Sequence, residues 1–251
     1  MNKIGIICAL RFEARCFTSA TLLAQQPVEL NDKTLLILSG MGAPRARQAA
    51  QQLVEAGVNC LVSFGAAGAL DPALGPGDLM APQEVCTAGK KYTVSKTMPA
   101  AAREHLSRHN VRIHSGLLTS ASEPLTSAAD KQALFRQSGA IAVDMESAAV
   151  LDMAQRHGLS ACVLRVILDA AHVTLPAAAL RRVDAFGKAD LPGLIGDLLR
   201  SSTQISPLLR LACASRRARR TMRLAAQAWL QSAAVTSLPV RDPGTNPSPA
   251  T

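Results

Sequence analysis

The sequence predicts a layered α/β domain, and three observations support this fold class. Short apolar runs alternate with helical patterns over residues 1–200, an order that is typical of α/β domains. The chain has 251 residues, 48% hydrophobic and 18% charged, a composition that excludes collagen, coiled coils and wholesale disorder. The excess of positive charge lies near the C-terminus, so the rest of the chain is almost neutral.

Seven runs are predicted strands, and several are apolar throughout, as expected of strands that are covered on both faces. They are Lys3–Ala9, Thr34–Ser39, Asn59–Phe64, Asp78–Val85, Arg112–Thr119, Ala140–Val143 and Ala161–Leu168. Helical patterns lie at Ala43–Ala56, Ser127–Ser138, Met145–His157 and Leu191–Arg200. Three of these helices are followed by a glycine, which is a common helix stop.

The C-terminal part of the chain predicts a separate segment. Apolar residues recur at steps of three, four or seven over residues 206–234, so we expect one long helix there. The formal net charge of the chain is +9, and residues 200–251 carry +7 of it. The predicted organisation is a domain over residues 1–202, an amphipathic Arg-rich helix over 203–235, and a disordered tail over 236–251.

Cysteine usage predicts a reducing compartment. The six Cys residues are scattered without a C-x-x-C pair, and three of them lie inside apolar runs, as buried thiols do. Arg11 and Glu13 follow the first apolar run at once, which argues against a secretory signal. The longest uncharged stretch, Leu224–Val240, is too polar for a good membrane span. We therefore expect a cytoplasmic protein, either free or peripheral on the inner membrane face.

The segments that follow the predicted strands carry the candidate chemistry, because ligands of α/β sheets bind beyond the carboxyl ends of the strands. In chain order they are Arg11-Phe12-Glu13, Gly40-Met41-Gly42, Gly65-Ala66-Ala67-Gly68, Asp144-Met145-Glu146 and Asp169. Gly-rich turns expose backbone N–H groups to a ligand, and paired carboxylates in a cleft suit acid–base catalysis at a glycosidic bond. Taken singly, each segment is more typical of an ordinary turn or helix cap, so the prediction depends on all five together.

The same segments resemble the nucleoside phosphorylase superfamily, and in particular its 5′-methylthioadenosine/S-adenosylhomocysteine nucleosidases. The matching motifs, in order over about residues 3–200, are Ile6–Glu13, Ser39–Gly42, Phe64–Leu70, Gly77–Leu79, Ala142–Ala149 and Val163–Asp169. Within the superfamily the chain resembles the hopanoid-associated phosphorylase-like proteins, which are regarded as adenosylhopane nucleosidases. That likeness is carried by Leu70–Leu79, Asp130–Phe135, Asp144–Ser147 and the Arg-rich C-terminal helix.

The resemblance implies a three-layer α/β/α fold with a central twisted mixed sheet, and it implies roles for single residues. Asp169 would be the general acid that protonates the purine N7, and Glu13 the general base that activates water. Glu146 would bind the ribose hydroxyls, with Met145 packed beneath the sugar. The other expected substrate-binding residues are Gly40, Gly42, Gly65, Ala67, Gly68 and Asp144. We expect no metal or other cofactor, with phosphate as a candidate co-substrate.

Arg165 is expected to be structural before it is catalytic. It lies inside an apolar predicted strand. A buried Arg needs a carboxylate partner, and Asp144 or Glu146 is the expected one.

Three departures from the family pattern keep alternatives open. Ala66 and Leu168 stand where the nucleosidases usually carry Ser, and no aromatic residue near positions 122–124 matches the one that stacks on the purine. The mobile Arg of phosphate-dependent members has only three candidates here, Arg11, Arg15 and Arg45.

The predicted reaction is cleavage of the N-glycosidic bond of an adenine nucleoside with a large hydrophobic 5′ group, such as lipid-linked adenosylhopane in hopanoid biosynthesis. The same chemistry on 5′-methylthioadenosine or S-adenosylhomocysteine, or phosphorolysis of a purine nucleoside, is one alternative. A non-catalytic nucleoside-binding module is another.

The Arg-rich helix predicts a partner surface. Its five central basic residues are Arg216, Arg217, Arg219, Arg220 and Arg223. Together with Leu208, Met222 and Trp229 on the apolar side they suit an interfacial helix on an anionic membrane. Packing on the chain's own domain or on a second subunit is an equal alternative. We expect no nucleic-acid partner, since the main domain is nearly neutral and aromatic residues are scarce, and we expect a homo-oligomer with a dimer favoured.

Overall fold

A computed structural model describes residues 3–174, 184–187 and 205–235 of the chain, with side chains described for residues 215–232 of the last range. The strands form one mixed sheet of eleven strands. They are β1 Ile4–Cys8, β2 Val28–Asn31, β3 Thr34–Leu38, β4 Cys60–Ala69, β5 Leu79–Met80, β6 Glu84–Thr87, β7 Lys90–Thr93, β8 Ile113–His114, β9 Leu118–Ser120, β10 Ala142–Asp144 and β11 Ser160–Asp169. The described helices are α1 Arg11–Ala14, α2 Ala43–Glu55, α3 Ala100–Arg108, α4 Ala128–Ser138, α5 Ser147–Arg156 and α8 Ile205–Val235.

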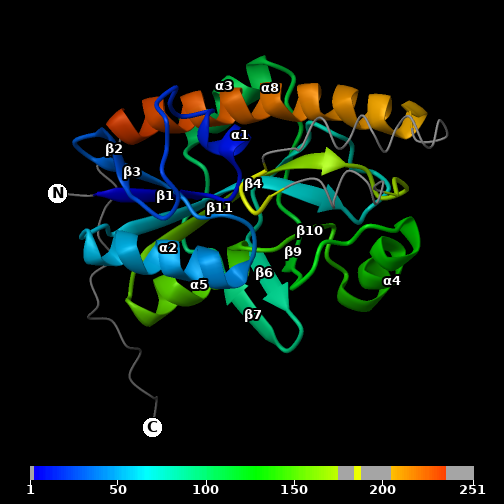
Figure 1. Cartoon of the computed structure of the whole chain (residues 1–251), viewed down its shortest axis with the longest axis horizontal. Coiled ribbons are helices and arrows are strands. Elements are labelled where there is room, and N and C mark those ends of the chain that lie inside the picture. The colour runs from blue at the N-terminus through cyan, green and yellow to red at the C-terminus, as the bar shows by residue number, and fades with distance from the viewer. Residues whose placement is uncertain (1–2, 175–183, 188–204, 236–251) are drawn as a thin grey trace, which may run out of the picture.

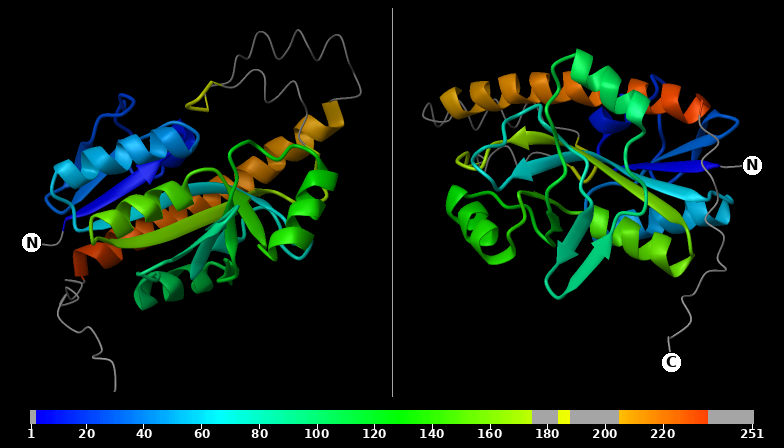
Figure 2. Two further views of the ribbon diagram at one scale, coloured as in Figure 1. Left: turned by 90° about the horizontal axis from the view of Figure 1, so that it is seen from below. Right: turned by 180° about the vertical axis from the view of Figure 1, so that it is seen from behind.

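The sheet lies between two layers of helices, as predicted (Figures 1 and 2). Side chains alternate along the central strands, so that Ile7 packs in one core cluster with α2 and α5. Its neighbour Ile6 packs in the other cluster with α1, α3 and α8. This two-sided burial explains why the central strands read as apolar throughout.

Strands β1, β4 and β11 run parallel at the centre of the sheet. β4 and β11 are ten residues long and stay paired almost throughout, well beyond the end of β1. The last part of β4 pairs with β10, which runs antiparallel to it. This arrangement brings the ends of β1, β10 and β11 to one region of the molecule.

Two predicted strands are each divided in the structure. The run Asp78–Val85 becomes β5 and β6, because Pro82 lacks the N–H that a continuous ladder needs. The run Arg112–Thr119 becomes β8 and β9, separated at Gly116, where an added Cβ would lie 2.5 Å from the Ile141 side chain. The predicted helix Leu191–Arg200 and the predicted disordered tail 236–251 lie outside the described residues.

The predicted Gly-rich turn at Gly65–Gly68 is wrong, because these residues continue β4 to Ala69. Here glycine allows two side chains to lie close to the backbone of β4, and it does not form a turn. A Cβ at Gly65 would stand 2.4 Å from a guanidinium nitrogen of Arg165 and 2.6 Å from Oε1 of Glu13. The loop Gly40–Gly42 is a turn as predicted, with φ of 83° and 95° at its two glycines.

Helix α8 packs on the chain's own sheet. The described apolar residues on its inner side, including Met222 and Trp229, are buried in the cluster that also holds α1 and α3. Thr221 donates a hydrogen bond to the carbonyl oxygen of Gly77 at 2.9 Å, and the Arg219 guanidinium lies 5.2 Å from the ring centre of Phe12. An interfacial helix with Met222 and Trp229 facing lipid is therefore wrong, and the alternative of packing on the domain holds. The side chain of Leu208 lies outside the described residues.

The outer side of α8 keeps its positive charge exposed. Arg216, Arg217, Arg219, Arg220 and Arg223 are all exposed in the structure. None of the described helices is long and apolar enough to cross a membrane.

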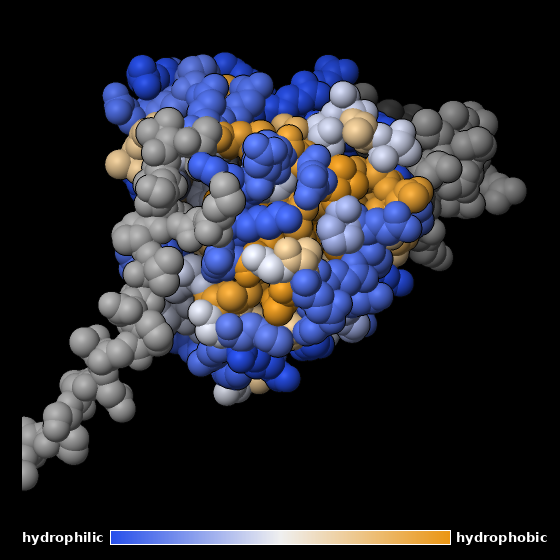
Figure 3. Space-filling view, turned by 90° about the vertical axis from the view of Figure 1, so that its left-hand side faces the viewer, coloured by the Kyte–Doolittle hydropathy of each residue, from blue (hydrophilic) through white to orange (hydrophobic). Residues whose placement is uncertain are grey.

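One side of the molecule carries a band of hydrophobic residues bordered by hydrophilic ones (Figure 3). Leu23 is the large hydrophobic residue that is exposed among the described residues, with 60% of its surface accessible. The expected homo-oligomer stays a prediction.

Candidate active site

One cleft holds the acidic residues that the sequence singles out. Glu13, Glu146 and Asp169 come from α1, the start of α5 and the end of β11, and all three line this cleft. Its other described lining residues are Ala9, Leu10, Met41, Ala66, Glu123, Pro124, Leu125, Val143, Asp144 and Met145. A single small ligand in the cleft is therefore within reach of all three acids.

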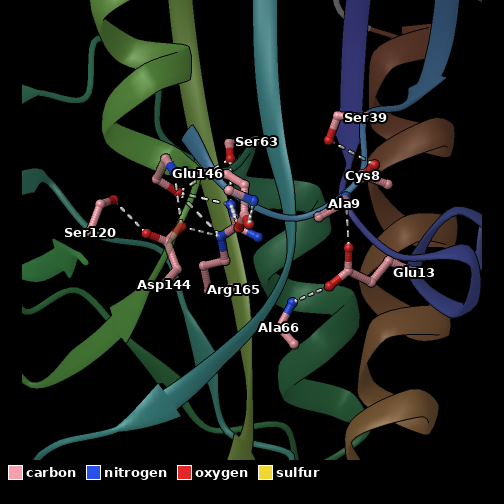
Figure 4. Close-up of polar contacts among 12 residues, drawn as sticks. Cys8, Ala9, Glu13, Ser39, Ser63, Ala66, Ser120, Asp144, Glu146 and Arg165 are labelled. Atoms are coloured by element: carbon pink, nitrogen blue, oxygen red, sulfur yellow. Dashed lines mark hydrogen bonds and ion pairs between the residues drawn. The ribbon is translucent and has the colours of Figure 1, made fainter. Parts of the chain in front are cut away.

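Glu13 is held rigidly by backbone amides. Its Oε2 accepts hydrogen bonds from the amides of Ala9 and Leu10, both at 2.9 Å, and its Oε1 accepts one from Ala66 at 2.8 Å (Figure 4). Burial raises the pKa of this carboxyl group to about 7, although Arg165 and the amides act in the opposite direction. A carboxyl group that titrates near neutrality suits a general base. It is not the solvated acid that commonly begins a helix, since it is only 1% exposed.

Glu146 connects the Gly loop to the centre of the site. Its Oε1 accepts a hydrogen bond from the Gly42 amide at 2.8 Å, and its Oε2 lies 3.6 Å from a guanidinium nitrogen of Arg165. Burial raises the pKa of the Glu146 carboxyl group, and Arg165 opposes that rise. The Gly42 amide is thus engaged by a carboxylate, so it is not a free donor for an anionic ligand.

Arg165 is the buried cation that balances the acids. Its Nε lies 2.8 Å from Oδ2 of Asp144, and its side chain also donates to the hydroxyls of Ser63 and Ser147. The prediction that Asp144 or Glu146 pairs with this Arg is confirmed, and both do. Asp144 accepts further hydrogen bonds from the Ser120 hydroxyl and the Ser147 amide. These bonds fix Asp144 at the base of the site (Figure 4).

Asp169 has a partner that the sequence did not predict. The ammonium group of Lys131, in α4, donates a hydrogen bond to its Oδ2. Burial raises the pKa of the Asp169 carboxyl group, and the charge of Lys131 opposes the rise. The two residues are 38 positions apart in the sequence, and no local spacing signals the contact.

The predicted binding glycines fall into two groups. Gly40 and Gly42 form the turn beside Glu146, and Gly65 and Gly68 lie on β4 against the catalytic candidates. A Cβ at Gly68 would meet the Asp169 carboxyl oxygens at 3.3 and 3.5 Å. None of these four glycines is in the described lining of the cleft, and neither is Ala67, which packs in the core cluster with α2 and α5; Ala66 lines the cleft instead.

Comparison with known proteins identifies the family. The model of the phosphorylase superfamily matches residues 3–189. The chain belongs to the phosphorylase superfamily. This confirms the superfamily that the motifs indicate and, at the level of the family, an enzyme of the nucleosidase and nucleoside phosphorylase class. No curated protein matches the sequence.

Solved structures share the fold of this superfamily member. Futalosine hydrolase of Helicobacter pylori matches with a TM-score of 0.67 and 18% identity, over 92% of this chain and 98% of that one. A 5′-methylthioadenosine/S-adenosylhomocysteine nucleosidase from the same organism, with butyl-thio-DADMe-Immucillin-A, matches with a TM-score of 0.66 and 18% identity, over 94% and 98%. The 5′-methylthioadenosine/S-adenosylhomocysteine nucleosidase of Neisseria meningitidis, with methylthio-immucillin-A, matches with a TM-score of 0.66 and 16% identity, over 92% of this chain and 100% of that one. At these identities the likeness shows the common fold, and the likeness to hopanoid-associated proteins stays a prediction.

The cleft of this phosphorylase-superfamily chain is acidic. Its described lining holds five acidic residues, Glu13, Glu123, Asp144, Glu146 and Asp169, and no basic one.

The three candidate phosphate-binding Arg residues do not line the cleft. Arg11 and Arg15 line a separate hollow next to Leu22, and Arg45 is outside the described lining with its guanidinium 3.3 Å from the carbonyl oxygen of Met41. Among the described residues, no group of three or more His, Cys, Asp or Glu could hold a metal ion.

Proposed function

We propose that this chain is a nucleosidase that hydrolyses the N-glycosidic bond of an adenine nucleoside. The observation that carries the proposal is the meeting of Glu13, Glu146 and Asp169 on one cleft, each from a separate family motif. A single sugar and base in that cleft would contact all three. The family and the nucleosidase relatives support the same reaction class.

The proposed mechanism uses each acid once. The Asp169 carboxyl group gives its proton to N7 of the purine, and the bond between C1′ and N9 breaks with its electron pair going to the base. Glu146 binds the ribose hydroxyls, and its carboxylate stabilises the positive charge that develops on the sugar. A water molecule adds its oxygen to C1′, and its proton passes to Glu13. General acid and general base catalysis contribute about 10²- to 10⁴-fold each.

The charge of the cleft favours water over phosphate as the nucleophile. A unit negative charge about 6 Å from one carboxylate is repelled by about 3 kcal/mol at an effective dielectric constant of about 20. The described lining carries five acidic residues and no basic residue, and the buried cations behind it, Arg165 and Lys131, are each paired with acids of the cleft. Arg165 is already committed to Asp144, Glu146 and two hydroxyl groups. Water carries no such penalty.

We further propose a nucleoside with a large hydrophobic 5′ substituent, such as adenosylhopane in hopanoid biosynthesis. The motif resemblance supports it, and so do the apolar lining residues Leu10, Met41, Leu125 and Met145. A small thioether such as 5′-methylthioadenosine is the second candidate, favoured by the names of the relatives.

The test is adenine release from a panel of nucleosides, with and without phosphate. The panel holds adenosine, 5′-methylthioadenosine, S-adenosylhomocysteine and an adenosine with a long 5′ alkyl chain. We expect release without phosphate, fastest for the alkyl nucleoside, and an approximately 10²- to 10⁴-fold loss in Asp169→Asn. Full activity in Asp169→Asn would overturn the mechanism, and no release from any nucleoside would overturn the function.

A lipid-linked substrate also calls for contact with an anionic membrane, which we propose occurs through the exposed Arg residues of α8. Because α8 packs in the core, its removal would disturb the fold, so substitution is the better test. We expect the full chain to sediment with vesicles containing anionic lipid, and the variant with Arg216, Arg217 and Arg220 changed to Gln to sediment less. Equal sedimentation of the two would remove membrane contact through these residues.

A further inference from the structure

Helix α4 places a fully buried lysine beside the active-site cleft. Lys131 is 0% exposed, and it is the buried residue of α4. The helix begins with a cap, in which the Ser127 hydroxyl accepts a hydrogen bond from the Asp130 amide. A buried lysine is costly unless its charge is paired and its hydrogens are bonded, so its position needs an explanation.

The ammonium group of Lys131 is fully used. It donates to Oδ2 of Asp169, to the carbonyl oxygen of Ala170 at 3.2 Å and to that of Val173 at 2.8 Å. Three acceptors match the three hydrogens of an ammonium group, whereas a neutral amine would have only two. These bonds join α4 to the end of β11 and the turn that follows.

This contact decides which carboxyl oxygen of Asp169 is available to a ligand. Oδ2 is occupied by Lys131, and no described residue forms a hydrogen bond with Oδ1. Asp169 lines the cleft, and Gly68 on β4 leaves room beside its carboxyl group.

We propose that Lys131 is a positioning residue of the nucleosidase reaction. Its ammonium group holds the Asp169 side chain so that Oδ1 is available to the purine. Its positive charge also stabilises the Asp169 carboxylate that forms when the proton moves to N7. The inference rests on the proposed function. In this step the proton that reaches the purine comes from Asp169, and Lys131 keeps all of its own hydrogens.

Two opposing influences act on Asp169. Burial disfavours its carboxylate, whereas the charge and the hydrogen bond of Lys131 favour it. The other acidic residues of the cleft are Glu13, Glu123, Asp144 and Glu146. Among the described residues, Lys131 is the cation in contact with it. Without Lys131 the proton would stay on Asp169 to higher pH, and the group would be a weaker acid for the purine.

The kinetic experiment compares Lys131→Met and Lys131→Arg with the wild-type chain on the best nucleoside of the panel. For Lys131→Met we expect kcat to fall at least tenfold while KM changes little. We also expect the alkaline limb of the kcat profile, where the general acid loses its proton, to move about 1–3 pH units upward. Lys131→Arg keeps the charge and should keep the wild-type limb. The matched control is Lys90→Met, which breaks the ion pair with Asp152 outside the cleft and should leave the profile unchanged.

A double substitution gives a second readout if Lys131→Met alone fails to fold. Because Lys131 acts through Asp169, Lys131→Met combined with Asp169→Asn should retain the residual rate of Asp169→Asn alone. Losses that multiply would overturn the proposal, as would an unmoved alkaline limb in folded Lys131→Met.

A substrate-free measurement separates this proposal from the proposed function. In protein with ¹³C-labelled Asp carboxyl groups, the Asp169 signal, assigned by its loss in Asp169→Asn, should titrate at higher pH in Lys131→Met than in wild type. An unchanged midpoint would overturn the role of Lys131 even if adenine is released. Absence of adenine release from the wild-type chain would instead overturn the proposed function.

Discussion

Replacing Gly65 with Ala is a direct perturbation of the site geometry. The new Cβ would stand 2.4 Å from a nitrogen of Arg165 and 2.6 Å from Oε1 of Glu13. Ordinary contacts begin near 3.4 Å, so one or both side chains must move by about 1 Å. Neither can move freely, since Glu13 accepts three backbone hydrogen bonds and Arg165 is paired with Asp144.

The expected cost follows from those bonds. Overpacking a core costs about 1–3 kcal/mol, and losing a hydrogen bond to a charged group costs about 1.5–3 kcal/mol. We therefore expect Gly65→Ala to lower the free energy of unfolding by about 2.5–6 kcal/mol. Displacing catalytic groups by about 1 Å should also lower kcat by about 10²-fold.

Urea unfolding and initial rates of adenine release measure the two effects. Gly75→Ala is the matched control, because its new Cβ would meet Arg112 at an ordinary 3.7 Å and its φ lies outside the left-handed region. We expect the control to retain stability and rate. If Gly65→Ala behaves like Gly75→Ala in both assays, Glu13 and Arg165 do not meet over Gly65 and the described site is wrong.

Two other predictions concern a titrating acid and the buried side of α8. The pKa of Glu13 is raised to about 7, so its protonated form is favoured in the folded state, and wild type should lose up to about 3 kcal/mol of stability as pH rises from about 4.5 to 7. Glu13→Gln should lose less over that range in urea unfolding and should lower kcat about 10²- to 10⁴-fold; an equal loss of stability would contradict the assignment. Trp229→Ala should cost about 3–5 kcal/mol in the same assay because Trp229 is buried, whereas the exposed Arg220→Gln should change stability by under about 0.5 kcal/mol. Equal stability of these two variants would mean that α8 does not pack on the sheet.

Much of the fold follows from local patterns in the sequence. The central strands are buried on both faces, so their apolar runs stand out, and a glycine follows α2, α4 and α5 as predicted. The sequence does not predict the edge strands β2 and β7, because their residues are exposed or half-buried and include charged and polar side chains. Residues 65–68 look like a turn in sequence, but their glycines serve the close approach of Arg165 and Glu13.

The contents of the site were predictable where they come from motifs at strand ends. Glu13, Glu146 and Asp169 follow predicted strands, and the sheet brings them to one cleft. Lys131 was not predictable in the same way, because it reaches Asp169 from a helix 38 residues away. The apolar side of α8 was visible as a pattern, but periodicity does not say whether a sheet or a membrane covers it.

The most direct test of the account is turnover of the best nucleoside in H₂¹⁸O with phosphate present. If the nucleophile is a water molecule activated by Glu13, the sugar product should carry one ¹⁸O at C1′ and the adenine should be unlabelled. The rate should not depend on the phosphate concentration. Formation of a sugar 1-phosphate, at a rate that rises with phosphate concentration, would contradict the account, because it would require the acidic cleft to admit an anion as the nucleophile.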